Sequence, residues 1–139
     1  MNRIHPAVAT VLATAAGFAL SAPSTASGPD TGIVRYVTDG DTFRLTTGER
    51  IRIAGIDAPE THRDQAHCAA EIALGTAAAV RARGLLDGRQ ISFVRLGRSY
   101  NRTVARVMLD GRDVARLFID AGIARAWPRG RPKPDWCHG

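Results

Sequence analysis

The sequence predicts a mainly β domain with two helices, an α+β fold. Two observations predict it: five short segments are β-branched or alternate between apolar and polar residues, as strands do, and two longer segments carry helical signals. The predicted order is three strands, a helix, two strands and a second helix. The chain has 139 residues, 45% hydrophobic and 23% charged, which fits one globular domain and excludes a multidomain enzyme and a disordered chain.

The first three strands are predicted to follow one another closely. Their patterns cover three ranges: residues 33–37, 42–46 and 50–56. Residues 47–49 read Thr-Gly-Glu, a turn that joins the second and third strands into a hairpin. Residues 57–68 lack periodicity and contain Pro59, so we expect a loop there.

The second half of the domain is predicted to contain both helices. Residues 69–86 are rich in Ala and Leu and end at Asp87-Gly88, a typical helix stop. Strands are expected at residues 90–96 and 103–109, separated by a polar loop over 97–102. The apolar residues of the second helix stand at helical spacing after a capping Asp113 and before Gly122: Val114, Leu117, Phe118 and Ala121. From Arg125 the proline-rich tail is expected to be extended.

Five strands with a helix between the third and the fourth, and a second helix after the fifth, match the five-stranded Greek-key barrel called the OB-fold. A split βαβ sandwich would need a helix after its first strand, and the sequence has none there. OB barrels bind oligonucleotides, oligosaccharides or proteins, so the fold leaves the function open.

The first 26 residues are expected to be a signal peptide. Arg3 and His5 precede an apolar stretch over 7–20, and small residues lead to a cleavage site near Ala26. The apolar stretch is shorter than a membrane span, and no later segment reaches that length. We therefore expect the domain at 27–139 to be secreted or periplasmic, without a stable membrane span.

Two cysteines, Cys68 and Cys137, lie in the predicted mature part. Export takes them to an oxidising compartment, where an even number of cysteines usually pairs, so we expect one disulfide. The alternative is a zinc site that adds the neighbouring His67 and His138. Adjacent residues on an extended chain point to opposite sides, and neither pair has the usual ligand spacing, which disfavours zinc.

The net charge is +6, with 19 Lys and Arg against 13 Asp and Glu, and Lys133 is the single lysine. The planar arginine fork suits bidentate contact with phosphate, so an anionic and polymeric partner is one interpretation. The other interpretation is that an arginine-rich codon bias replaced lysine throughout the chain.

Two acidic motifs are expected to meet at one end of the hairpin. Residues 39–42 read Asp-Gly-Asp-Thr just before the second strand, and residues 57–61 read Asp-Ala-Pro-Glu-Thr just after the third. By strand alternation Asp41 and Asp57 should point to the barrel mouth, where carboxylates and carbonyls suit calcium or magnesium. Two turn aspartates would be the simpler interpretation.

Nearby arginines and a glutamate favour the cation site over two simple turn aspartates. Arg52 lies on the same hairpin, Glu60 follows Asp57 by three residues, and Arg102 precedes the last strand. A cation site, a carboxylate base and two arginines together indicate phosphoryl transfer.

The sequence resembles the staphylococcal-nuclease-like thermonucleases between about Ile33 and Trp127. The resemblance rests on three ordered motifs: residues 39–42, Arg-Ile-Ala-Gly-Ile-Asp-Ala-Pro-Glu-Thr at 52–61, and Tyr-Asn-Arg-Thr-Val-Ala-Arg at 100–106. The family consists of calcium-dependent nucleases on an OB-fold. The resemblance therefore implies a calcium-dependent nuclease that hydrolyses phosphodiester bonds of DNA, RNA or both and leaves 3′-phosphate ends.

The resemblance also assigns roles to residues. Asp41, Asp57 and the carbonyl of Ala58 would bind Ca²⁺. Glu60 would be the general base, with Arg52 and Arg102 stabilising the phosphate in the transition state.

The rest of the comparison is less complete. The base-covering tyrosines of the family have no clear match, so Tyr100 and Trp127 are candidates for stacking on a base or for ordinary packing. Asn101, where the family often has glycine, is expected at a left-handed turn.

We expect a monomer with a nucleic acid substrate, and the alternative is an OB-fold module that binds single strands without cutting them.

Overall fold

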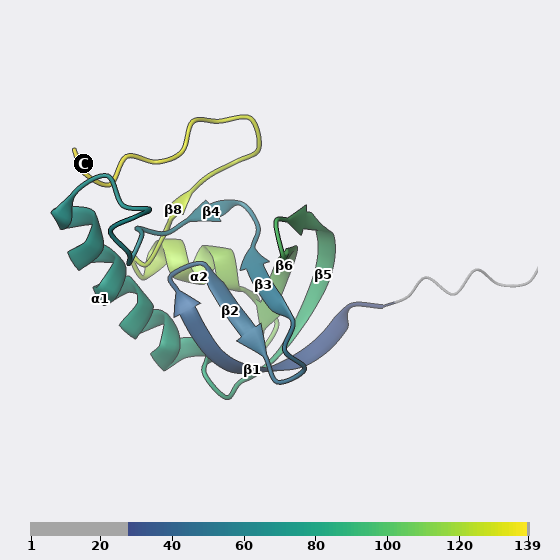
Figure 1. The fold of residues 1–139 in the computed structure, drawn as a ribbon. Coiled ribbons are helices and arrows are strands. Elements are labelled where there is room, and N and C mark those ends of the chain that lie inside the picture. Colours follow the sequence, from purple (N-terminus) through teal and green to yellow (C-terminus); the bar gives the residue numbers. More distant parts are fainter. Residues whose placement is uncertain (1–27, 139) are drawn as a thin grey trace, which may run out of the picture.

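The computed structural model describes residues 28–138 (Figure 1). The predicted signal peptide at 1–26 lies outside the described residues, so its expectation is not tested. Within the described part, no helix is long and apolar enough to span a membrane.

Five strands form a closed barrel. They are β1 (Asp30–Asp39), β2 (Thr42–Leu45), β3 (Arg50–Ile53), β5 (Gln90–Ser99) and β6 (Arg102–Leu109). The sheet order is β3-β2-β1-β5-β6, with all neighbours antiparallel, and a parallel pairing between β3 and β6 closes it. The predicted OB-fold is confirmed.

Both predicted helices are present. α1 (Ala69–Leu86) lies between β3 and β5 in the chain and packs beside β1 (Figure 1). α2 (Val114–Asp120) starts at the predicted cap, where the Asp113 carboxylate accepts a hydrogen bond from the Arg116 amide. Cys68 caps α1 in the same way, through a contact of its sulfur with the Glu71 amide.

The core fills the barrel and the space under both helices. It is built from the inward positions of the strands and the barrel-facing sides of α1 and α2, and its largest members are Phe43, Phe93, Phe118, Leu45 and Ile51. The alternation that predicts the strands also predicts the inward, buried positions of this core, although some outward positions of β1 and β5 are apolar too: Ile33, Tyr36, Val94 and Leu96.

The third strand is shorter than predicted. It ends at Ile53, and the chain turns at Gly55, whose φ of +78° is easy only for glycine. A separate short strand, β4 (Ile56–Asp57), pairs with β8 (Arg125–Ala126). The tail is therefore not wholly extended surface from Arg125, because its first two residues are held in a small sheet next to the acidic motif.

The predicted polar loop at 97–102 is also wrong in its extent. β5 and β6 continue through it and leave only Tyr100 and Asn101 as a tight turn. The left-handed residue of that turn is Tyr100, at φ +54°, and not Asn101. Asn101 instead accepts a side-chain hydrogen bond from Arg50 at 2.8 Å. A final short strand, β7 (Arg112–Asp113), pairs with β6 and leads into α2.

Candidate active site

A single pocket of about 610 Å³ contains every predicted catalytic, metal-binding and stacking residue. These residues come from the β1–β2 turn, β3, β4, the loop after β4, the β5–β6 turn, the start of β6 and the tail: Asp41, Arg52, Asp57, Ala58, Glu60, Tyr100, Arg102 and Trp127. The position of Arg52, which lies close to both Asp41 and Asp57, agrees with the sequence prediction that the hairpin brings the two acidic motifs together. Their chemical roles are a separate question, considered below.

Two aspartates of the acidic motifs, Asp41 and Asp57, are buried and share one arginine side chain. Asp41 is 7% exposed and Asp57 1%. The Arg52 guanidinium lies 3.2 Å from the Asp41 carboxylate and 3.7 Å from that of Asp57. Asp41 also accepts hydrogen bonds from the Thr42 hydroxyl and the Ala58 amide. The positive charge between the two carboxylates is therefore partly supplied by the protein itself.

Asp57 has two further partners, both from the tail. The indole N–H of Trp136 donates to Asp57 at 2.9 Å, and the Lys133 ammonium lies 3.6 Å from the other carboxylate oxygen. The Arg125 guanidinium stacks on the Trp136 ring at 4.3 Å and donates to the carbonyl of Asp135. The tail thus holds the Asp57 carboxylate in one orientation through these two contacts.

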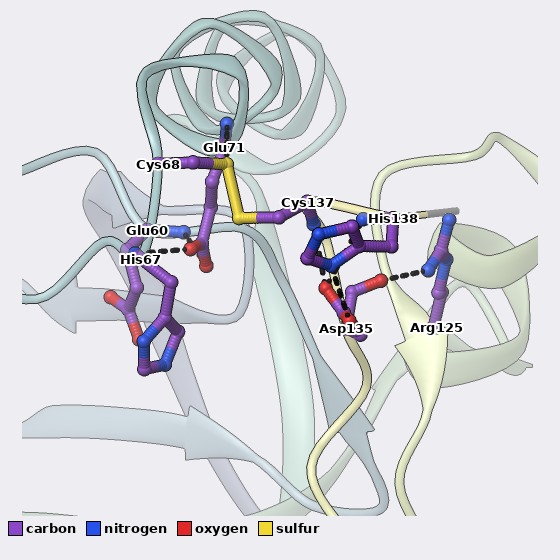
Figure 2. The surroundings of a disulfide bond; sticks show 8 residues. All are labelled: Glu60, His67, Cys68, Glu71, Arg125, Asp135, Cys137 and His138. Carbon is purple, nitrogen blue, oxygen red and sulfur yellow. Dashed lines mark hydrogen bonds and ion pairs between the residues drawn. A yellow bond between two sulfur atoms is a disulfide. The ribbon is translucent and has the colours of Figure 1, made fainter.

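Glu60 lies on a loop that α1 holds in place. The buried carboxylate of Glu71, on the first turn of α1, accepts hydrogen bonds from the Glu60 amide at 3.3 Å and from the His67 amide at 2.8 Å (Figure 2). The loop approaches the helix closely at Gly75, where an added methyl group would stand 2.4 Å from the Glu60 carbonyl oxygen. The Glu60 side chain itself forms an ion pair with Lys133 at 2.7 Å.

A second glycine lets the two acidic motifs approach each other. A methyl group on Gly40 would lie 2.6 Å from the Ala58 side chain. Since neighbouring atoms cannot come so close, only glycine fits between Asp39 and Asp41 without a shift of the chain. The Asp-Gly-Asp spacing is therefore a packing requirement as well as a turn.

Two carboxyl groups of the pocket have raised pKa values. Burial, together with the neighbouring Asp41, raises the pKa of Asp39 to about 7. Burial also raises the pKa of Asp57, although the Trp136 hydrogen bond and Lys133 oppose the shift. A bound cation would favour the ionised forms of both, and all the available ligand atoms are oxygens. This donor set and charge fit a hard divalent cation.

The protein supplies few ligands for such a cation. Among residues 28–138, no three His, Cys, Asp or Glu side chains gather in a metal-binding cluster. Asp41 and Asp57 are linked through the Arg52 guanidinium. A cation here would therefore depend on backbone oxygen and water for the rest of its coordination shell, which calcium tolerates.

Basic and aromatic residues also line the pocket. Arg102 is half-buried, and its guanidinium takes part in none of the ion pairs found within residues 28–138. Tyr100 is 93% exposed, which excludes core packing as its role. Trp127 lies beside Arg52, whose guanidinium is 5.3 Å from the ring centre. One face of that ring is thus already used.

The predicted disulfide is present between Cys68 and Cys137, with their Cα atoms 6.1 Å apart (Figure 2). It joins the end of the tail to the start of α1. Sulfur atoms in a disulfide are not thiolate ligands, so the alternative zinc site is wrong.

The model of the staphylococcal nuclease homologue family matches residues 50–135. The chain belongs to this family. The match covers β3, the loop with Glu60, both helices and most of the tail. Membership in the staphylococcal nuclease homologue family indicates a nuclease-like function or another nucleic-acid-related function on an OB-fold. A comparison with curated proteins finds no match.

Four residues that hold or contact the site of this nuclease homologue are not predicted from its sequence: Glu71, Gly75, Lys133 and Trp136. Glu71 and Gly75 look like ordinary residues of an Ala-rich helix, and only the packed loop reveals their contacts. Lys133 had one available signal, because it is the only lysine beside many arginines. Trp136 had another, because its neighbour Cys137 is tied to α1.

Proposed function

We propose that this nuclease homologue is a calcium-dependent phosphodiesterase that hydrolyses DNA, RNA or both. The single observation that carries the proposal is the pocket itself, where Asp41, Asp57, Glu60, Arg52 and Arg102 converge. A barrel that only holds single strands has no need for buried carboxylates that repel the phosphate backbone. A hydrolase needs them for a cation and a base.

Each residue has a task that its surroundings suit. Asp41, Asp57 and the carbonyl of Ala58 would hold the calcium ion, which supplies Lewis-acid stabilisation of the phosphate. Glu60, on the loop held by Glu71, would accept the proton of the attacking water. Arg102 and the remaining donors of Arg52 would stabilise the negative charge that grows on the phosphate oxygens while the 5′ oxygen leaves.

The stacking roles differ between the two aromatic candidates. Tyr100 is exposed at the rim of the pocket, where a base of the substrate could reach its ring. Trp127 already contacts Arg52, so we assign it the positioning of that guanidinium as well as the pocket wall.

Export is part of the proposal. Residues 1–26 would act as a signal peptide, leaving a secreted or periplasmic domain at 27–139 that works as a monomer. The disulfide supports an oxidising destination, since such bonds are rare in the cytosol of mesophiles.

The test is a cleavage assay of the mature chain. Single-stranded DNA, duplex DNA and RNA are each incubated with calcium, with magnesium and with chelator. We expect products with calcium, fewer with magnesium, whose strict octahedral geometry fits this site less well, and none with chelator. Binding to single strands without a product in any lane would favour the alternative, a non-catalytic binding module.

A further inference from the structure

The single lysine of the chain lies on the two carboxylates that hydrolysis would use. The Lys133 ammonium is 2.7 Å from a Glu60 oxygen and 3.6 Å from an Asp57 oxygen. Every other basic side chain apart from histidine is an arginine. An ammonium group is a compact, strongly hydrated point charge, and in this respect it resembles a metal cation more than a guanidinium does.

This contact conflicts with the proposed work of Glu60. A base that accepts a proton from water needs a free oxygen, and a charge-assisted hydrogen bond from Lys133 occupies one. A lysine ammonium beside two carboxylates is charged at neutral pH. The Glu60 oxygen that Lys133 holds can accept a proton only after Lys133 has moved.

The tail is attached to the rest of the domain on both sides of Lys133. On one side, the Trp127 amide donates to the Gly55 carbonyl at 2.8 Å. On the other, Trp136 is bonded to Asp57 and Cys137 to Cys68. Between these anchors the Lys133 side chain is about one-third exposed, and within residues 28–138 its ion pairs and side-chain hydrogen bonds are with Glu60 and Asp57 alone.

We propose that Lys133 is a tethered counter-ion of the active site, which neutralises Asp57 and Glu60 in the metal-free enzyme and leaves them when calcium binds. Because the ammonium and the metal compete for the same carboxylates, Lys133 would set the calcium affinity of the enzyme. The inference rests on the proposed function, since it requires that calcium binds here.

The single lysine allows a direct test by acylation. The mature chain is treated with an amine-reactive acetylating reagent at fixed pH, with and without calcium chloride, and the rate of Lys133 modification is followed by mass spectrometry. The α-amino group serves as internal reference. We expect calcium to increase the Lys133 rate several-fold, in step with calcium saturation measured by calorimetry, and to leave the reference rate unchanged.

Calorimetry of two variants gives a second readout. Lys133→Gln should bind calcium about tenfold more tightly than the parent, because the competing charge is gone. Arg131→Gln, the matched control, removes the same charge from the same segment outside the carboxylate contacts and should bind about as the parent does.

The outcomes separate the two proposals. Calcium binding without a change in the Lys133 acylation rate, or weaker calcium binding by Lys133→Gln, would overturn the counter-ion proposal and leave the proposed function intact. A loss of turnover in Lys133→Gln at unchanged calcium affinity would overturn it too, because Lys133 would then act on the phosphate. No calcium binding by the parent or by Lys133→Gln would overturn the proposed metal dependence itself.

Discussion

The two arginines of the pocket differ in how much of their charge is already paired with carboxylates. Arg52 uses one guanidinium nitrogen on Asp41 and Asp57, so part of its charge is already neutralised. Arg102 faces the same pocket and takes part in none of the ion pairs within residues 28–138. The arginine best placed to follow charge that grows in the transition state is therefore Arg102.

Replacing Arg102 with alanine should lower turnover by about 10²- to 10³-fold and weaken substrate binding far less, because the lost interaction strengthens only in the transition state. Steady-state kinetics with a defined oligonucleotide measures both effects. Arg106→Ala is the control, because Arg106 lies on the same strand, is exposed and is not part of the pocket. A loss confined to KM would mean that Arg102 binds the ground state only.

Among the secondary-structure elements, α1 is the one that carries the Glu60 loop. Glu71 holds the loop by two hydrogen bonds, and Gly75 lets it approach the helix backbone. A glycine in a helix interior usually lowers helix stability, so its presence in the sequence looks unfavourable until the loop is seen. The same helix contains a second glycine, Gly84, with no atom near its missing side chain.

These two glycines should respond oppositely to alanine. Gly75→Ala should lower the free energy of unfolding by about 1 to 3 kcal/mol, because the methyl group would overlap the Glu60 carbonyl, and it should also reduce cleavage. Gly84→Ala should raise the free energy of unfolding by about 0.5 to 1 kcal/mol and leave cleavage unchanged. Urea unfolding of both variants is the measurement, and equal stabilisation would show that the loop does not press on α1.

The strands of the barrel are joined at one point by a charged cluster. Glu49, just before β3, accepts hydrogen bonds from Arg95 on β5 at 2.9 Å and from Thr103 on β6 at 2.7 Å. The Arg95 hydrogen bond, followed by that of Thr103, lowers the pKa of Glu49 below its usual 4.5. A carboxyl group whose pKa is lower in the folded state contributes stability above the unfolded pKa and loses it as the pH falls through the folded value.

Glu49→Gln should therefore be less stable than the parent at pH 7, by up to about 1 kcal/mol, since the Arg95 pair is partly exposed and screened. The difference should shrink as the pH falls below about 4.5 and vanish in stronger acid. Denaturant unfolding of both proteins across this pH range measures it. A difference that is constant from pH 3 to pH 7 would show that the charge of Glu49 does not contribute.

For the whole molecule, the disulfide joins the two ends of the described C-terminal half. It closes a span of 69 residues, from the start of α1 to the end of the tail (Figure 1). Cross-linking a span of this length restricts the unfolded chain and should stabilise the fold by about 4 kcal/mol. In the folded state it also holds the tail that carries Lys133 and Trp136 over the pocket.

Replacing Cys68 and Cys137 with serine should thus lower the free energy of unfolding by about 4 kcal/mol. Serine at position 68 can still cap α1, so the loss reports the cross-link and not the cap. An unchanged unfolding midpoint would show that the disulfide is not a stabilising element.

The sequence predicts the barrel and the two acidic motifs because both depend on local patterns: strand alternation, an Ala-rich helix and the Thr-Gly-Glu turn. It misses what depends on approach between distant segments. The end of β3 at Ile53 follows from the pairing of β4 with β8, seventy residues away. The contacts of Lys133 and Trp136 with Glu60 and Asp57 likewise arise only when the tail folds back, which no local periodicity encodes.

The central claim is that this barrel cuts nucleic acid with Glu60 as the base. Glu60→Gln keeps the size of the side chain but removes its ability to accept a proton. Asp64→Asn, on the same loop and exposed, is the matched control. The decisive measurement is the single-turnover cleavage rate with saturating calcium, together with substrate affinity. We predict a loss of about 10²- to 10⁴-fold for Glu60→Gln with affinity retained, and no loss for the control. Cleavage by Glu60→Gln at the parent rate would contradict the account.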